Sequence, residues 1–144
     1  MVTEVPFVVV ADRDRAHESL VSAGLRELGY EVQGARSVYE LHRLLEARPL
    51  DALLVDLSMF GTSVTFMNAV LTPRRPLIVV LMLALGSGLT PEVARASGFD
   101  GCFAKIVDVR RLDRFLRDRL PLSRRPPRRQ PANALELSGV SSSR

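Results

Sequence analysis

The sequence predicts an α/β fold in which five parallel strands form one doubly wound sheet and a helix follows each strand. Two observations predict it. Short apolar runs recur without polar alternation, which is typical of strands buried on both faces of a parallel sheet. Between these runs, apolar residues recur at helical spacing, and alternating strands and helices favour right-handed crossovers with helices on both faces. With 144 residues, the chain has room for one such domain and a tail.

Apolar periodicity gives the expected position of each element in chain order. We expect strands at residues 7–11, 31–34, 52–55, 77–83 and 101–104. We expect helices at residues 20–28, 38–45, 66–71, 91–97 and 109–116.

Each expected helix carries its own start or stop signal. The first helix ends at Gly29, and residues 37–40 (Ser-Val-Tyr-Glu) form a capping box for the second. Residues 72–73 (Thr-Pro) stop the third helix. Residues 90–91 (Thr-Pro) start the fourth with a capping hydroxyl and a proline in the first turn, and Asp108 caps the fifth. Local signals therefore support the five repeats.

The periodic pattern stops after residue 120. Residues 123–131 are dominated by arginine and proline, which cannot form a helix or an inner strand. Residues 121–144 carry five arginines and one glutamate, and this accounts for the whole net charge of +4. We therefore expect a domain of residues 1–120 and a disordered basic tail of residues 121–144. Such a tail could touch nucleic acid or an anionic membrane surface, but four clustered arginines without aromatic residues favour a solvated terminus.

Composition excludes several classes of protein. No apolar run approaches the roughly 20 residues of a membrane span, and the N-terminus lacks the basic and apolar segments of a signal peptide. The single cysteine excludes an internal disulfide and a cysteine-built metal site. The two histidines are too far apart in sequence to suggest zinc. Together these features predict a cytoplasmic protein.

The candidate site lies where the predicted strands end. In open parallel sheets, ligands bind beyond the carboxyl ends of the strands, and these ends carry Asp12, Asp56, Leu83 and Lys105. Lys105 is the only lysine among 20 basic residues. A lysine ammonium is a compact point charge, which suits a tight anionic pocket better than a planar guanidinium does. We expect Lys105 to face both aspartates, although one lysine in an arginine-rich composition could also arise by drift.

The order of these features resembles the receiver domain of response regulators in two-component signalling. The resemblance covers residues 5–120 and implies a flavodoxin-like fold. It also implies that Asp56 accepts a phosphoryl group from a histidine kinase, that the acidic pair after the first strand holds Mg²⁺, and that Lys105 pairs with the phosphoryl oxygens. A receiver is a signalling protein rather than an enzyme, and its partners are a kinase or an output protein. Its fourth helix, fifth strand and fifth helix commonly form a dimer face.

The expected metal pocket departs from the receiver pattern. The acidic pair is Asp12-Arg13, so an arginine takes the place of the second carboxylate. Asp14 lies one residue further on and could complete a Mg²⁺ site with Asp12 and Asp56. Arg13 could instead place a guanidinium where the charge of the metal would lie. Of these two alternatives, we favour the pocket without metal.

The residues that switch a receiver are also replaced. The hydroxyl of the fourth strand falls at Leu83, and the aromatic residue of the fifth strand falls at Cys102. Phe103 should point to the opposite face of that strand. A conformational switch needs contacts that differ between two states, and the usual ones are missing here. We therefore predict a degenerate, single-domain receiver that acts through protein contacts, with a working phosphoacceptor as the alternative.

Overall fold

The predicted doubly wound α/β fold is confirmed by the computed structural model, which describes residues 4–61, 63–84 and 86–126. Five strands pair in parallel in the order β2-β1-β3-β4-β5. The strands are β1 (Phe7–Ala11), β2 (Glu31–Ala35), β3 (Ala52–Asp56), β4 (Ile78–Leu83) and β5 (Gly101–Ala104). The chain order reverses between β1 and β3, so the topological switch point lies there.

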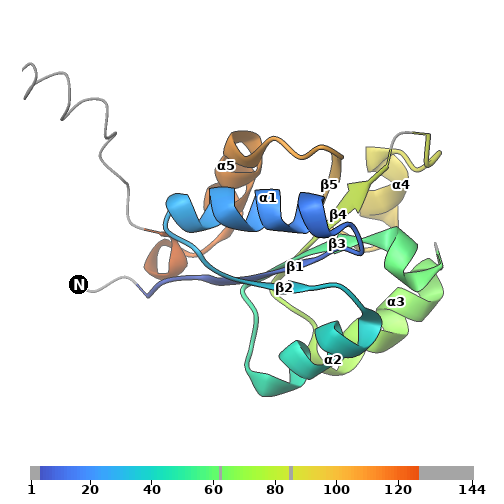
Figure 1. Cartoon of the computed structure of the whole chain (residues 1–144), viewed down its shortest axis with the longest axis horizontal. Helices are drawn as coiled ribbons and strands as arrows, with labels where there is room; N and C mark the ends of the chain where they lie inside the picture. Colours follow the sequence, from blue (N-terminus) through green and yellow to red (C-terminus); the bar gives the residue numbers. More distant parts are fainter. Residues whose placement is uncertain (1–3, 62, 85, 127–144) are drawn as a thin grey trace, which may run out of the picture.

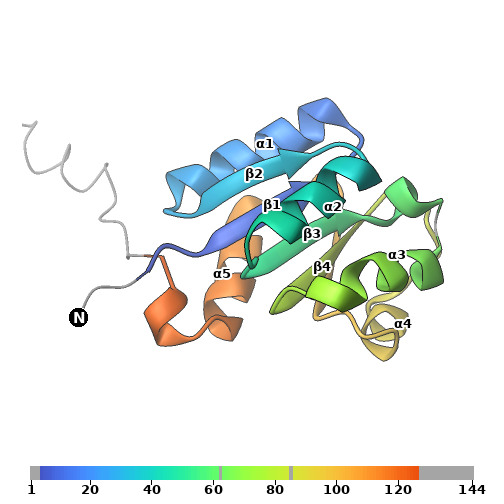
Figure 2. The same cartoon turned by 90° about the horizontal axis from the view of Figure 1, so that it is seen from below.

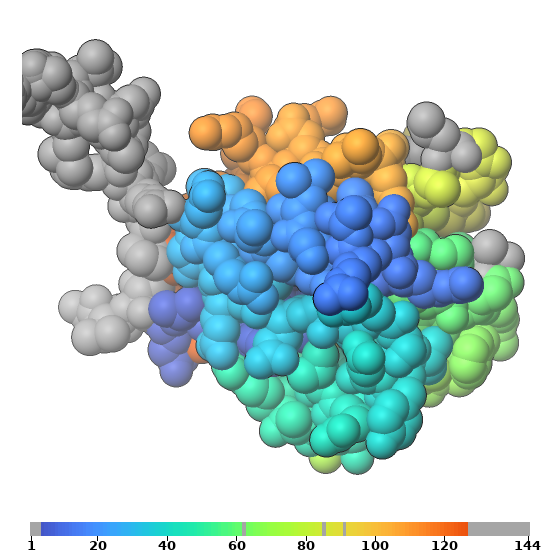
Figure 3. Space-filling model, in the orientation of Figure 1, coloured from blue at the N-terminus to red at the C-terminus, as the bar shows by residue number. Residues whose placement is uncertain are grey.

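Helices cover both faces of the sheet (Figures 1 and 2). They are α1 (Arg15–Glu27), α2 (Val38–Ala47), α3 (Val64–Leu71), α4 (Pro91–Ala96) and α5 (Val109–Arg119). Short 3₁₀ turns are η1 (Leu57–Phe60), η2 (Thr72–Arg74) and η3 (Leu122–Arg124). Helices α1 and α5 lie on one face, and α2 and α3 lie on the other. Figure 3 shows α1, in blue, beside α5, in orange. None of the helices in the described ranges is long and apolar enough to cross a membrane.

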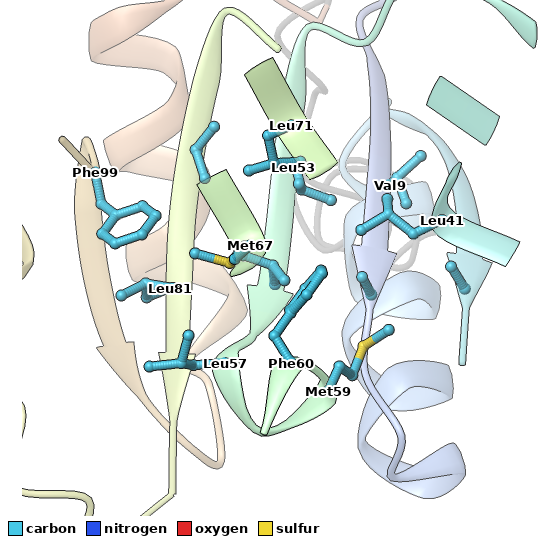
Figure 4. Close-up of a cluster of buried hydrophobic side chains, with 14 of the residues drawn as sticks. Val9, Leu41, Leu53, Leu57, Met59, Phe60, Met67, Leu71, Leu81 and Phe99 are labelled. Atoms are coloured by element: carbon cyan, nitrogen blue, oxygen red, sulfur yellow. The ribbon is translucent and has the colours of Figure 1, made fainter. Parts of the chain in front are cut away.

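The strand residues alternate between two cores, which explains why their sequence is apolar throughout. On β1, Val9 packs against the α2–α3 side, while Val8 and Val10 pack against the α1–α5 side. Figure 4 shows the first of these cores, where side chains from the strands meet those from α2, η1 and α3. Cys102 packs with the first core and Phe103 with the second. The prediction that these neighbours point to opposite faces is therefore confirmed.

The predicted caps form as the local sequence requires. Ser37 accepts a hydrogen bond from the backbone N–H of Glu40, and the Glu40 carboxylate accepts one from the N–H of Arg36. Thr90 caps α4 through the amide three residues on, and Asp108 caps α5 through the amides two and three residues on. Each cap supplies an acceptor to an amide that has no partner within its helix.

The prediction of disorder from residue 121 is wrong for residues 121–126. Arg124 donates hydrogen bonds to Glu4, over 2.7 Å, and to Asp51, over 3.0 Å from Nε to Oδ1. The backbone N–H of Glu4 donates to the carbonyl of Ser123 over 3.0 Å. These contacts bind the segment to the start of β1 and β3, because a guanidinium matches a carboxylate in geometry and charge. The rest of the predicted tail lies outside the described residues.

These contacts also bear on the hypothesis that the basic tail binds nucleic acid. Two of its four clustered arginines are used within the domain, since Arg124 pairs with Asp51 and Arg125 donates to the carbonyl of Leu120 over 3.0 Å. Residues 128–129 lie outside the described ranges. A guanidinium committed to a carboxylate is less available for a phosphate. The contacts of Arg124 and Arg125 within the domain therefore count against nucleic-acid binding by these two arginines.

Candidate functional site

Three charged residues meet at the carboxyl end of the sheet. Asp12 follows β1 directly, Asp56 ends β3, and Lys105 follows β5. The register pairs the last residue of β1 with Val55, which places Asp12 and Asp56 side by side. The backbone N–H of Lys105 donates to the carbonyl of Leu83 over 2.8 Å, so β4 fixes where the lysine side chain begins. The predicted convergence of these three residues is thus present in the structure.

The Lys105 ammonium bridges the two carboxylates. Its Nζ lies 2.8 Å from Asp12 Oδ1 and 3.0 Å from Asp56 Oδ2. The side chains are 17% exposed for Lys105, 0% for Asp12 and 8% for Asp56. Because these groups are largely removed from solvent, salt screens their attraction only weakly. One cation therefore holds together two carboxylates that would otherwise repel each other.

Every carboxylate oxygen of the pocket accepts a hydrogen bond. Asp12 Oδ1 also accepts from the backbone N–H of Asp14 over 2.9 Å, and Asp12 Oδ2 lies 2.7 Å from His17 Nδ1. Asp56 Oδ1 accepts from the backbone N–H of Ser58 over 2.9 Å, and Asp56 Oδ2 accepts from the Ser58 hydroxyl over 2.8 Å. This network satisfies the buried carboxylates without a metal ion.

The pocket shifts the proton affinity of its charged groups in opposite directions. Burial alone would raise the pKa of Asp56, but hydrogen bonds from Ser58 and Lys105 outweigh it and lower the pKa below its ordinary value. Burial alone would lower the pKa of Lys105, but its bonds to Asp12 and Asp56 raise it. Both shifts favour the charged forms, so the ion pair is formed at neutral pH.

Two predicted residues of the metal pocket lie outside it. The Asp14 side chain caps α1 by accepting a hydrogen bond from the N–H of His17 over 3.1 Å, and the residue is exposed. Arg13 is also exposed and pairs with no carboxylate in the part of the chain that the structure describes. Lys105, and not Arg13, therefore supplies the positive charge beside Asp12.

The described part of the pocket offers a hard cation two carboxylates, those of Asp12 and Asp56. A small hard cation requires several oxygen ligands in near-octahedral geometry. Among the residues with described positions, no three His, Cys, Asp or Glu side chains converge as metal ligands. One oxygen of each carboxylate, Asp12 Oδ1 and Asp56 Oδ2, is bonded to Lys105. A metal ion bound here would share these carboxylates with the lysine.

Sequence reasoning missed two residues of the site. His17 was considered only as a zinc ligand, yet it lies five residues after Asp12 in the first turn of α1, close to the same strand end. Ser58 lies two residues after Asp56, and Asp-x-Ser is a common Asx-turn pattern. Both signals were local and could have been read from the sequence.

Comparisons with known proteins add evidence about the fold. No protein-family profile matches the sequence, and no curated protein matches it. Solved structures do match. A response regulator receiver protein from Pseudomonas putida aligns with a TM-score of 0.69 and 18% identity over 81% of this chain and 99% of that one. The chain has the fold of a receiver domain.

Two further receiver structures support this assignment. The chemotaxis response regulator CheY4 of Vibrio cholerae has a TM-score of 0.67 and 21% identity over 81% of this chain and all of that one. A response regulator from Burkholderia pseudomallei has a TM-score of 0.66 and 18% identity over 96% of this chain and 75% of that one. The latter structure is described with a phosphorylated aspartic acid, a calcium ion and citrate.

The positions that the receiver resemblance assigns to the switch hold Leu83 and Cys102. Leu83 is buried and lines a cavity of about 490 Å³ together with Asp56 and Ser58. Cys102 is partly buried, and burial raises the pKa of its thiol. Leu83 has no polar side-chain atom, and Cys102 carries no ring. Ser87, in the loop after β4, also lines this cavity, and its hydroxyl accepts a hydrogen bond from the N–H of Leu89. Sequence reasoning missed this residue as well.

Proposed function

We propose that this chain is a receiver-like signalling protein that acts through protein–protein contacts, with little or no conventional phosphorylation switching. The observation that carries this proposal is that the switch positions hold Leu83 and Cys102, which bring neither a hydroxyl nor a ring. The bridge from Lys105 to Asp12 and Asp56 supplies positive charge to the pocket from within the chain. The pocket is a stable structural element of the fold, and no enzymatic turnover is needed for its role.

The replaced switch positions support the same proposal. A ligand or modification shifts a conformational equilibrium only if it makes different contacts in the two states. Leu83 offers no hydroxyl to follow a phosphoryl group, and Cys102 offers no ring that could exchange positions with it. Phosphorylation of Asp56 would therefore lack the usual route to a partner surface.

One observation favours a second candidate, a working phosphoacceptor. Asp56 opens onto the 490 Å³ cavity, so a phosphodonor could approach its carboxylate. The solved response regulator from Burkholderia pseudomallei is described with a phosphorylated aspartic acid and a calcium ion. In this alternative, a histidine kinase phosphorylates Asp56, Lys105 pairs with the phosphoryl oxygens, and Asp12 and Asp56 would hold a divalent ion such as Mg²⁺.

Incubation with a small phosphodonor and Mg²⁺, followed by intact-mass measurement, separates the two candidates. We expect no phosphoryl adduct, because the attacking carboxylate is hydrogen-bonded to Lys105 and Ser58. The Asp56→Asn variant is the matched control and should likewise show only its own unmodified mass. A phosphoryl adduct on the wild type that the variant lacks would establish the phosphoacceptor in place of our proposal.

We place the partner contact on the face formed by α4, β5 and α5. Strand β5 is an edge of the sheet, and beside it lies a cavity of about 400 Å³ bordered by Arg95, Arg111 and Arg119. Ile106 and Val93 are exposed there, at 75% and 47%. Exposed apolar side chains beside arginines are typical of a contact surface, either for a second copy or for an output protein.

Sedimentation velocity over a range of concentrations tests this face. We expect the wild type to form a dimer that Val93→Arg weakens at least tenfold, because the added charge would be buried beside the arginines of this face. The control is Leu20→Arg, which changes a similarly exposed leucine, 54% exposed, on α1. A wild type that stays monomeric, or a dimer that both variants weaken alike, would contradict the assignment of this face to self-association.

A further inference from the structure

His17 connects the charged pocket to the loop that precedes α5. The residue lies in the first turn of α1, and its side chain is only 4% exposed. Its Nδ1 lies 2.7 Å from Asp12 Oδ2, and its Nε2 lies 3.2 Å from the backbone nitrogen of Val107. Both nitrogens of a buried imidazole are therefore bonded, one to the pocket and one to the backbone of the β5–α5 loop.

The partners of the ring determine its tautomer. The Val107 backbone nitrogen carries a hydrogen and can only donate, so His17 Nε2 accepts and bears no proton. Nδ1 then carries the proton and donates it to the Asp12 carboxylate. A neutral imidazole in this tautomer satisfies both neighbours. In the other tautomer, an Nε2–H would point at the Val107 N–H, and a bare Nδ1 would point at the Asp12 carboxylate.

The hydrogen bonds close a ring around the pocket. The Lys105 ammonium donates to one oxygen of Asp12, and His17 bonds to the other. The backbone N–H of Val107, in the same loop as Lys105, donates to His17 and completes the ring. Val107 is buried, and it immediately precedes Asp108, the N-cap of α5. If Lys105 moves or Asp12 changes orientation, the hydrogen bonds of His17 transmit that change to the backbone of Val107, next to the start of α5.

We infer that His17 is a positioning residue that couples the Asp56–Lys105 pair to the start of α5. This route runs along the α1–α5 side of the sheet and passes through neither Leu83 nor Cys102. A regulatory role for this coupling rests on the proposed signalling function. The physical coupling between the two sites does not depend on that function. Loss of the Asp56 charge frees Lys105 to bind Asp12 alone, Asp12 reorients, and the bond from Val107 to His17 changes length or breaks.

Backbone NMR of the full chain measures this coupling without phosphorylation or a partner. We expect Asp56→Asn to shift the Val107 amide resonance in the wild-type background. The same substitution in a His17→Leu background should leave that resonance unshifted, because both ring bonds are gone. His17→Gln keeps one donor and one acceptor on a planar group of similar reach, so it should restore the shift.

A matched control lies at the opposite end of the sheet. The backbone N–H of Val79 donates to Asp100 Oδ2 over 2.8 Å, so Asp100→Asn should shift Val79 and leave Val107 unchanged. An equal response of Val107 to Asp56→Asn with and without His17 would overturn the inference, as would a glutamine variant that behaves like leucine. If His17→Leu does not fold, the imidazole ¹⁵N shifts decide: a protonated Nδ1 with a bare Nε2 supports the coupling, and the reverse overturns it.

Discussion

Replacing Lys105 with methionine is expected to lower the free energy of unfolding at pH 7 by about 3 kcal/mol. Methionine keeps most of the length of the side chain and removes its charge, so Asp12 and Asp56 face each other without a cation. Removing one partner of a buried ion pair typically costs 3–5 kcal/mol, because the remaining charge is poorly solvated. We take the lower end since the Lys105 side chain retains some contact with water.

The effect should depend on pH with a defined sign. The lowered pKa of Asp56 means that its contribution is present above its ordinary pKa and is lost as the pH falls through the lowered value. The raised pKa of Lys105 means that its contribution is complete below the ordinary lysine pKa and is lost as the pH rises through the raised value. The difference between wild type and variant is therefore largest in the neutral range and shrinks toward pH 3.

Urea unfolding at pH 7 and at about pH 3.5 checks this prediction, because over this range carboxyl groups of the unfolded chain gain protons that Asp56 in the folded wild type resists. Two variants serve as controls. Asp56→Asn combined with Lys105→Met removes one of the facing charges and should recover part of the loss. Arg48→Met removes an exposed pair with Glu31, replaces the contact of the guanidinium with the Phe7 ring by an apolar one, and should change stability by only about 1 kcal/mol. A loss from Lys105→Met that is equal at both pH values would contradict an electrostatic cause.

The second large effect concerns the segment after α5. A chain that ends at Leu120 is expected to be about 2 kcal/mol less stable than one that ends at Pro126. The shorter chain loses the guanidinium of Arg124 from Asp51, whose side chain is 13% exposed and also accepts the backbone N–H of Phe7. A carboxylate that keeps only one of its hydrogen bonds at a partly buried position loses charge-assisted stabilisation.

Thermal unfolding followed by circular dichroism compares the two truncated chains with the full chain. The chain ending at Pro126 should melt close to the full chain, and Arg124→Ala in the full chain should reproduce most of the loss. Arg128→Ala is the matched control, because it removes an arginine beyond residue 126. Equal melting temperatures for the chains ending at Leu120 and Pro126 would show that the segment contributes nothing to stability.

The elements of the fold could be predicted because their signals are local or repeated. A strand such as β4 is apolar at every position since alternate residues enter two different cores. Caps such as Ser37 and Asp108 act over two or three residues, so the sequence alone shows donor and acceptor together. The convergence of Asp12, Asp56 and Lys105 was predictable because parallel strands bring their carboxyl ends to the same edge.

Contacts between distant segments could not be predicted in the same way. Arg124 and Asp51 are 73 residues apart, and nothing near either residue indicates the partner, so residues 121–126 were assigned to the tail. Val107 meets His17 through a backbone amide, which leaves no trace in the side-chain pattern. Arg13 was placed in the pocket by analogy with an acidic residue, but the direction of its side chain depends on how α1 leaves β1.

The hydrogen bond between Glu4 and Ser123 brings the first and last described segments of the domain together at the amino end of the sheet. Asp12, Asp56 and Lys105 lie at the carboxyl end, so the sheet separates the pocket from these two segments. A short linker could therefore join the ends and allow a circular permutation, and the domain could be inserted into a loop of another protein. In such a fusion, both connections would leave the pocket and the α4–β5–α5 face unobstructed.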